Sequence, residues 1–437
     1  MSQTHLPLNL KNLETIINLK TIPNLETIPI KNMLGDRMLY RKMPNIKEKL
    51  SILGFGCMRL PLLKKGGLDE KRAMAQIRHA IDNGVNYIDT AWPYHAGKSE
   101  PLVGKALEDG YREKTHIATK LPSWMVKNRE HMDFFLSEQL RLLKTEQIDF
   151  YLIHNLAGPM WESLKKMNVL DFIDKAKQTG KIKYAGFSFH GRVDDFKKIV
   201  DDYPWEFCQI QYNFLDEFHQ AGTEGLEYAA KKNLGIIIME PLRGGKLGLP
   251  VPPIEVNNIW KKAEHHRTPA EWALRWIWDH PQVSVILSGM NEERHIEENL
   301  NIANNALPAS LTSKELDLVK QAAHTYKQLM KVGCTGCEYC LPCPVGVNIP
   351  SAFEVLNKYH MFKNMEEAKF MYAMRCGGIF SGLGDGYASL CIQCGECLEK
   401  CPQGIPIPDV LEEVVKEFED DKVKERLIMG KKMLNME

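Results

Sequence analysis

The sequence has no excess of charge of either sign, because 56 lysines and arginines balance 56 aspartates and glutamates. Without a basic surplus, the composition gives no reason to expect nucleic acid or an anionic membrane as a partner. Long apolar runs are also missing. None approaches the roughly 20 residues that a membrane-spanning helix needs, and the polar first residues lack the apolar core of a secretory signal. We therefore expect a cytoplasmic protein without a membrane span.

A further absence is the G-x-G-x-x-G turn of a Rossmann nucleotide site, of which only the fragment Gly54-Phe55-Gly56 is present. Across residues 50–305, short β-rich runs instead alternate with longer amphipathic stretches. The runs are SILGFG, VNYIDTA, THIATK, IDFYLIH, IKYAGFS, EFCQIQY, LGIIIME and VSVIL. Eight strands, each followed by a helix, favour an α/β fold of the (β/α)8 TIM barrel type over an open doubly wound sheet.

Composition divides the chain into three parts. Residues 1–36 repeat the segment NLETI beside prolines and have no periodic apolar stripe, which predicts a weakly ordered extension. Residues 37–310 contain the predicted barrel. Residues 311–437 contain helical patterns around two cysteine-rich runs, which predicts a small helical domain with two ligand-binding loops.

Cysteines are concentrated near the C-terminus, where eight of the eleven fall into two short runs. The runs are Cys334, Cys337, Cys340 and Cys343, followed by Cys391, Cys394, Cys397 and Cys401. The second has the C-x2-C-x2-C-x3-C-P spacing in which three close thiolates bind one [4Fe–4S] cluster and the fourth reaches a neighbouring cluster. We therefore predict two clusters, one bound by Cys334, Cys337, Cys340 and Cys401 and the other by Cys391, Cys394, Cys397 and Cys343.

The first run departs from this pattern by one residue just before its last cysteine. Since that cysteine serves the other cluster, its local spacing is the least constrained. Zinc is the main alternative, but zinc sites usually pair two C-x2-C knuckles across an intervening loop, whereas here four thiolates crowd into each run. Cysteine ligands must stay reduced, which again favours the cytoplasm.

Four ionisable residues lie at or just beyond the ends of consecutive predicted strands, where active sites of this fold are found: Asp89, Tyr94, Lys120 and His154. We expect Lys120 to lower the pKa of Tyr94 by stabilising its phenolate, with Asp89 keeping Lys120 charged. Tyr94 then donates a proton to a carbonyl oxygen that His154 orients. Taken singly, these residues also fit a buried ion pair and a core histidine, but their common position at strand ends favours one shared site.

The motifs around these residues resemble those of the aldo/keto reductases. YIDTAWPY, GKSEPLVGKAL, IATK and YLIHN have the family's Asp, Tyr, Lys and His in the same order and strand positions, and the resemblance covers residues 39–305. GCTGCEYCLPCPVGVNIP and CIQCGECLEKCPQGIPIP resemble the branch with a C-terminal ferredoxin-type domain. The resemblance implies an oxidoreductase that uses NADP or NAD to reduce a small carbonyl or oxidise an alcohol.

The resemblance also implies how the nicotinamide cofactor is bound without a Rossmann unit. Ser188 and Gln209 are expected to hold the carboxamide, and Met239 replaces the aromatic ring that often stacks on the nicotinamide. The residues expected near the adenosine end are Ser288, Gly289, Arg294, Glu298 and Asn299. Gly289 and His295 replace basic residues that commonly bind the 2′-phosphate, which leaves Arg294 as the nearest candidate and the choice between NADP and NAD open.

How the two halves work together is not fixed by these motifs. Hydride transfer moves two electrons at once, whereas each [4Fe–4S] cluster accepts one, so direct exchange between them needs a converter. Three hypotheses follow. The first is a carbonyl reductase whose clusters exchange electrons with a ferredoxin or flavoprotein partner. The second is a reductase with purely structural clusters, and the third is a non-catalytic nicotinamide-sensing subunit of a larger redox complex.

Overall fold

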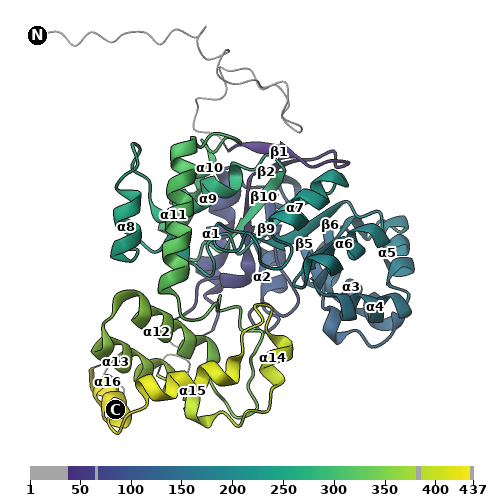
Figure 1. Cartoon of the computed structure of the whole chain (residues 1–437). Coiled ribbons are helices and arrows are strands. Elements are labelled where there is room, and N and C mark those ends of the chain that lie inside the picture. Colours follow the sequence, from purple (N-terminus) through teal and green to yellow (C-terminus); the bar gives the residue numbers. More distant parts are fainter. Residues whose placement is uncertain (1–37, 64–66, 380–384, 434–437) are drawn as a thin grey trace, which may run out of the picture.

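Eight parallel strands form a closed barrel in this computed structural model, which describes residues 38–63, 67–379 and 385–433 (Figure 1). The predicted N-terminal extension lies outside these residues. The barrel strands are β3 (Leu53–Gly56), β4 (Tyr87–Asp89), β5 (His116–Leu121), β6 (Ile148–Leu156), β7 (Ile182–Phe189), β8 (Phe207–Gln211), β9 (Gly235–Met239) and β10 (Val283–Ser288). Each coincides with a predicted run, and β10 pairs with β3 to close the circle, so the predicted (β/α)8 barrel is confirmed.

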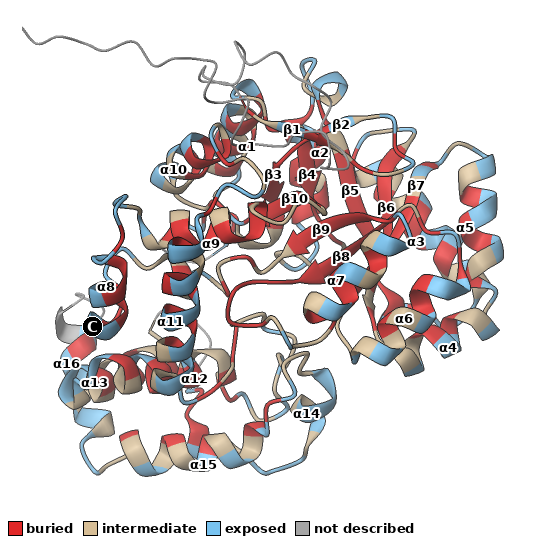
Figure 2. Ribbon diagram, turned by 45° about the horizontal axis from the view of Figure 1, so that its top comes forward, coloured by how far each residue is buried: buried red, intermediate tan, exposed pale blue. Residues whose placement is uncertain are grey.

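Helices follow the strands around the outside of the barrel. They are α1 (Glu70–Asp82), α2 (Ser99–Ala106), α3 (Arg129–Leu142), α4 (Gly158–Lys166), α5 (Val169–Gln178), α6 (Val193–Asp202), α7 (Gly222–Lys231), α8 (Ile254–Trp260), α9 (Pro269–Trp278) and α10 (Glu293–Ala303). Short 3-10 helices are η4 (Cys57–Arg59), η5 (Arg112–Lys114), η6 (Ser123–Met125), η7 (Lys246–Gly248) and η8 (Ala388–Leu390). Figure 2 shows the consequence of the sequence periodicity: buried residues fill the strands and line the inward faces of the helices.

Large side chains fill the barrel interior, so it is a packed core and not a channel. Tyr87, Phe150 and Phe207 pack together there. The centroid of the Phe150 ring is 5.0 Å from that of Tyr87 and 5.2 Å from that of Phe207. An antiparallel hairpin of β1 (Tyr40–Lys42) and β2 (Lys49–Ser51) lies beside this core and contributes Leu50 to it. The sequence analysis did not predict this hairpin, because its three-residue strands are too short to show a period.

The C-terminal part begins with α11 (Ser313–Leu329), which runs down one side of the barrel toward five further helices (Figure 1). These are α12 (Ile349–Phe362), α13 (Met365–Cys376), α14 (Glu396–Lys400), α15 (Ile407–Phe418) and α16 (Val423–Met433). They have a separate apolar core that includes Phe353, Leu411 and Phe418. No helix in the described part of the chain combines the length and apolar character needed to cross a bilayer.

The boundary expected after residue 310 stays a prediction. One face of α11 packs on the barrel, where Val319, Ala322 and Tyr326 join the core between strands and helices. The second core begins at Val332. We therefore propose that the barrel unit extends to the end of α11 and that the cluster domain starts at about residue 332.

Candidate functional site

A buried ion pair lies where β4 and β5 end. Asp89 is the last residue of β4, and its two carboxylate oxygens each accept a hydrogen bond of 2.8 Å from Nζ of Lys120. Lys120 also donates to the backbone carbonyl of Thr90 at 2.7 Å and is fully buried. Removing an ammonium from water costs several kcal/mol, and the hydrogen bonds to Asp89 and Thr90 offset part of that cost.

Tyr94 and His154 lie beside this pair. Nζ of Lys120 is 5.1 Å from the centroid of the Tyr94 ring, which is itself 6.1 Å from the imidazole centroid of His154. The hydroxyl of Ser123 donates a hydrogen bond of 2.5 Å to the backbone carbonyl of His154. The ring of Trp124 packs against the His154 imidazole, with ring centroids 5.1 Å apart. The four residues singled out from strand ends are thus neighbours in space.

The expected lowering of the Tyr94 pKa is wrong. Although Tyr94 borders a cavity, protein atoms surround it closely, and this burial raises its pKa well above that of a free phenol, as does the negative charge of Asp89. The positive charge of Lys120 does not outweigh these effects, because Asp89, 2.8 Å from Nζ of Lys120, acts on the phenol in the opposite direction. Tyr94 is therefore a neutral phenol at physiological pH and can act as a proton donor without prior ionisation.

His154 is also held in its neutral form. Burial lowers its pKa well below the usual value, and the positive charge of Lys120 lowers it further. Nδ1 is buried and has no hydrogen-bond partner among the described residues, while Nε2 faces the hydroxyl of Tyr339 at 3.4 Å. A neutral imidazole with Nε2 at the cavity is suited to orienting an oxygen atom rather than to carrying a proton.

These side chains open into a cavity of about 440 Å³ at the C-terminal ends of the strands. Asp89, Tyr94 and His154 line its floor, with Lys120 buried beneath. Every residue expected to contact the nicotinamide cofactor lines the same cavity: Ser188, Gln209, Met239, Ser288, Gly289, Arg294, Glu298 and Asn299. The structure thus gathers both predicted sets around one space.

The residues near Ser188 fit a nicotinamide carboxamide. Oε1 of Gln209 is buried without a hydrogen-bond partner among the described residues, although a buried amide oxygen normally has one. Oγ of Ser188 accepts a 2.8 Å bond from the backbone N–H of Asn155, which leaves its own hydrogen to donate. A carboxamide offers the matching N–H and C=O groups.

The far end of the cavity combines a positive charge with ordered polar groups. Arg294 is exposed there, and Nδ2 of Asn299 donates to Oγ of Ser288 at 2.8 Å. Glu298 accepts a bond of 2.6 Å from the hydroxyl of Thr268. An arginine with free access to the cavity suits a phosphate group.

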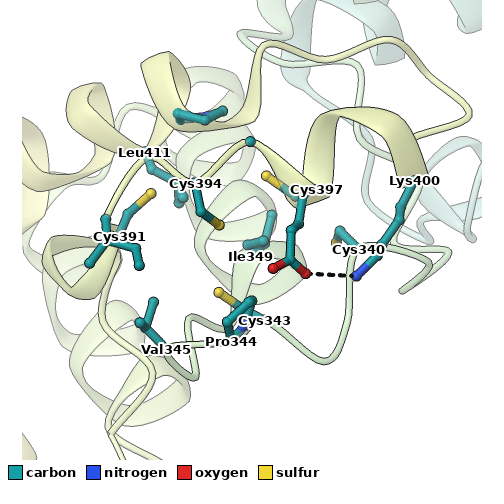
Figure 3. A pocket seen from close by; sticks show the side chains of 14 residues that line it. Cys340, Cys343, Pro344, Val345, Ile349, Cys391, Cys394, Cys397, Lys400 and Leu411 are labelled. Carbon is teal, nitrogen blue, oxygen red and sulfur yellow. Dashed lines mark hydrogen bonds and ion pairs between the residues drawn. The ribbon is translucent and has the colours of Figure 1, made fainter.

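The eight clustered cysteines form two neighbouring sets. Cys334, Cys337, Cys340 and Cys401 line one cavity, and Cys343, Cys391, Cys394 and Cys397 line the next, which Cys340 also borders. Figure 3 shows the second set facing a common space, near the apolar side chains of Ile349 and Leu411. The last cysteine of each run has crossed to the other set, as the spacing predicted.

Four thiolates in an apolar surrounding are the donor set of a [4Fe–4S] cluster, so both sets fit one. In the described residues, His, Cys, Asp and Glu side chains nowhere gather in groups of three or more that could hold a single metal ion. A cube spreads its four thiolates more widely than one ion does, and this finding therefore agrees with the two cysteine-lined cavities.

The first cysteine run also forms part of the active-site cavity. Cys337, Tyr339 and, from the second run, Gln403 line the same space as the barrel residues. The loop after β9 packs closely against this run: Gly244 has φ of +69°, and a Cβ there would be 2.2 Å from the backbone oxygen of Thr335. The barrel and the cluster domain therefore share one wall.

Sequence reasoning missed several residues of this wall: Arg59, His190, Glu240, Tyr339 and Gln403. Arg59, His190 and Glu240 follow strands β3, β7 and β9, a position that the barrel fold makes suggestive. Tyr339 and Gln403 carry no comparable signal, because their contacts depend on how the two domains dock.

Barrel, strand-end site and cysteine sets together define an oxidoreductase barrel with an iron–sulfur module. The model of the aldo/keto reductase family matches residues 52–321, and that of a 4Fe-4S dicluster domain matches residues 333–405. The chain belongs to the aldo/keto reductase family and has a C-terminal ferredoxin-type domain.

Individual relatives are similar over the barrel. The probable aldo-keto reductase 1 of Glycine max is 27% identical over 309 residues, which are 63% of this chain and 86% of that protein. The aldo-keto reductase yakc [NADP(+)] of Schizosaccharomyces pombe is 23% identical over 321 residues, 64% of this chain and 90% of that protein. The holo structure of aldo-keto reductase AKR11C1 from Bacillus halodurans has a TM-score of 0.55 and 24% identity over 65% of this chain and 96% of its own, a likeness of fold.

Proposed function

We propose that this protein is an NAD(P)H-dependent reductase of small carbonyl compounds, or in reverse an NAD(P)+-dependent dehydrogenase of the corresponding alcohols. One observation carries the proposal. Tyr94 and His154 lie beside the buried Asp89–Lys120 pair, in the cavity that Gln209 also lines, and the amide oxygen of Gln209 has no hydrogen-bond partner in the described part of the chain. One group of residues thus suits a carbonyl oxygen and the other suits a carboxamide.

The chain's own residues supply the proton and the orientation. Ser188 and Gln209 would hold the carboxamide of a bound nicotinamide, which would supply the hydride for the carbonyl carbon, so that negative charge would develop on the carbonyl oxygen. Tyr94 donates its phenolic proton to that oxygen, which yields the alcohol. Lys120 lies beside the tyrosine and stabilises the phenolate left behind, while Nε2 of His154 holds the oxygen in place.

Purified protein tests this proposal directly. With NADPH or NADH and a small aldehyde such as propanal, loss of absorbance at 340 nm should accompany alcohol formation in equal amounts. Absence of turnover with either cofactor across a panel of aldehydes and ketones would favour the nicotinamide-sensing alternative, in which the cofactor binds without reacting.

Cofactor binding depends on Gln209 in this proposal. Gln209→Leu keeps the side-chain volume but removes the partner of the carboxamide, so we expect Kd for NADPH and for NADH to rise about 10-fold, as one lost hydrogen bond implies. Fluorescence titration of the purified protein measures this. Gln147→Leu, on the loop before β6 and outside the cavity, is the matched control. An unchanged affinity in Gln209→Leu would contradict the assignment.

The pH dependence follows from the two shifted groups. Tyr94 must be protonated to donate, and burial, which raises its pKa, favours the protonated form; His154 must be neutral, and burial, which lowers its pKa, favours the neutral form. We therefore expect kcat/KM for carbonyl reduction to vary less than about 3-fold between pH 6 and pH 9. Initial rates in overlapping buffers test this. A limb with an apparent pKa near 6.5 would assign proton transfer to a histidine instead.

The cofactor identity is proposed as NADP or NAD. Arg294 is the side chain best placed to bind a 2′-phosphate, since it lines the cavity and is exposed. The relative from Schizosaccharomyces pombe has NADP(+) in its name. Comparing Kd values of NADPH and NADH for the wild-type protein decides between them.

We also propose that the cysteine sets hold two [4Fe–4S] clusters that exchange electrons with a ferredoxin or flavoprotein partner. The second set lies at the surface, where Cys394 is exposed and Ile392 and Leu398 keep 65% and 44% of their surface accessible. The first set adjoins the active-site cavity, and Cys340 borders both sets. The two sets thus form a series from surface to cavity.

Each cluster transfers one electron at a time, so reduced clusters give an EPR signal that a purely structural role does not require. Anaerobic protein with measured iron and sulfide content should be mixed with NADPH, with and without a reduced flavoprotein. A reduced-cluster EPR signal that appears only when the flavoprotein is present supports electron exchange with such a partner. Absence of signal under every pairing would favour structural clusters.

A further inference from the structure

Tyr339 belongs to the cluster domain but projects into the barrel's cavity. It lies in the first cysteine run, two residues after Cys337 and one before Cys340. Its hydroxyl is 3.4 Å from Nε2 of His154, and its ring meets the His190 ring edge-on with centroids 6.0 Å apart. A residue of the first cysteine run therefore lies next to the nitrogen of His154 that faces the proposed carbonyl site.

Contacts to the barrel fix this loop on one side. Arg243 donates to the backbone carbonyl of Gly333 at 3.1 Å, and Nζ of Lys246 donates to that of Cys334. Gly244 allows the backbone of Thr335 to approach within contact. Arg243 is itself buried and paired with Asp216 at 3.1 Å.

The segment that follows the second cysteine run is also held by barrel side chains. Nε2 of Gln403 donates to Oε1 of Gln211 at 2.9 Å, and Nε2 of Gln220 donates to the backbone carbonyl of Pro402, also at 2.9 Å. The segments beside both cysteine runs therefore contact barrel side chains, and Tyr339 lies between two ligand cysteines of the first run.

The wall near Tyr339 is polar. His190 and Gln403 line the cavity beside it, and Nδ1 of His190 is hydrogen-bonded to Oε1 of Gln220 at 3.1 Å. Burial lowers the pKa of His190 to about 4, so it is neutral at physiological pH and its other nitrogen is available to a ligand. A cavity wall with a phenol, an imidazole and an amide suits a substrate with more than one polar group.

We propose that Tyr339 is a specificity-determining residue that binds a second oxygen of the substrate, on the carbon next to the carbonyl. This inference rests on the proposed carbonyl reduction. The carbonyl oxygen must reach both Tyr94 and Nε2 of His154, and the Tyr339 hydroxyl lies next to that same nitrogen. Oxygens on adjacent carbons are about 3 Å apart, so one can occupy the carbonyl site while the other contacts Tyr339. The favoured substrates are α-hydroxy aldehydes and ketones.

Two aldehydes that differ by a single hydroxyl test the proposal. Lactaldehyde has a hydroxyl beside its carbonyl, and propanal has the same three-carbon chain without it. We expect the wild-type protein to prefer lactaldehyde in kcat/KM and Tyr339→Phe to reduce that preference about 10-fold, the size of one hydrogen bond. The loss of kcat/KM in Tyr339→Phe should be smaller for propanal than for lactaldehyde by that same factor.

Controls separate this role from a structural one. Tyr359→Phe removes a hydroxyl from α12, in the same domain and outside the cavity, and should leave the preference unchanged. Iron and sulfide content and Kd for NADPH should equal those of the wild type in both variants. If Tyr339→Phe lowered kcat/KM equally for propanal and lactaldehyde, or changed it for neither, the proposal would be overturned.

Binding without turnover keeps the inference separate from the proposed function. In the presence of NADPH, calorimetric titration with 1,2-propanediol and 1-propanol compares the two alcohol products. Tyr339→Phe should weaken binding of the diol about 10-fold and leave that of 1-propanol unchanged. If the wild type reduces neither aldehyde but this difference holds, carbonyl reduction fails and the Tyr339 site stands. If diol binding does not change, the Tyr339 site fails.

Discussion

Tyr94→Phe is expected to lower kcat for carbonyl reduction about 1,000-fold while Kd for NADPH changes less than about 2-fold. A positioned proton donor contributes roughly 100- to 10,000-fold to such a reaction. Phenylalanine keeps the ring that packs over Lys120 and removes only the phenolic oxygen. Steady-state rates at 340 nm and a fluorescence titration with NADPH measure the two quantities on the same preparation.

Tyr87→Phe is a matched control for this substitution. Tyr87 lies on β4, two residues before Asp89, and points into the packed barrel interior, where its hydroxyl has no hydrogen-bond partner among the described residues. Its removal should leave kcat unchanged. Wild-type turnover in Tyr94→Phe would assign the proton to another group and would leave the Asp89–Lys120 pair as a structural feature.

The second large effect concerns the iron–sulfur loop. Cys337→Ala should lower the iron content by up to about four atoms per chain, since it removes a ligand of the set nearest the cavity. Cys337 and Tyr339 line the active-site cavity, so loss of the cluster should displace this part of its wall. We therefore also expect kcat/KM for carbonyl reduction to fall about 100-fold, because a small displacement of positioning groups can lower a rate by that factor. Metal analysis and initial rates on anaerobically purified protein provide the measurements.

Cys376→Ala provides the comparison within the same domain. Cys376 is a buried thiol at the end of α13 and lines neither cysteine cavity. Its substitution should keep both the iron content and kcat/KM. Full reductase activity in Cys337→Ala, despite lost iron, would show that the barrel works without an ordered cluster loop.

The sequence predicted the parts of this molecule that depend on local pattern. Continuous apolar runs marked the barrel strands, and the strand-end positions of Asp89, Lys120 and His154 brought them together in space. Cysteine spacing predicted both the two sets and the exchange of Cys343 and Cys401 between them. Each of these depends on a rule that holds within a strand or a loop.

Features that depend on docking and burial were not predictable in this way. Tyr339 is 185 residues from His154, and no pattern links a residue inside a cysteine motif to a barrel histidine. The predicted direction of the Tyr94 pKa shift was wrong, because the shift depends on how many protein atoms surround the phenol, whereas the motifs indicated only that Lys120 is near. Charge pairing and solvent exclusion compete at that site, and only the packed structure shows which is stronger.

If the barrel reduces carbonyls and the cysteine sets hold clusters, as proposed above, the shared wall between the cysteine run and the barrel ties reductase activity to the supply of metal. Thiolate loops of this kind acquire much of their order from the metal that they bind. A cell short of iron would then make a barrel with its proton donor in place but with Tyr339 unplaced and the mouth open to water. Synthesis of the polypeptide and gain of substrate selectivity would be separate events, with cluster insertion as the step between them.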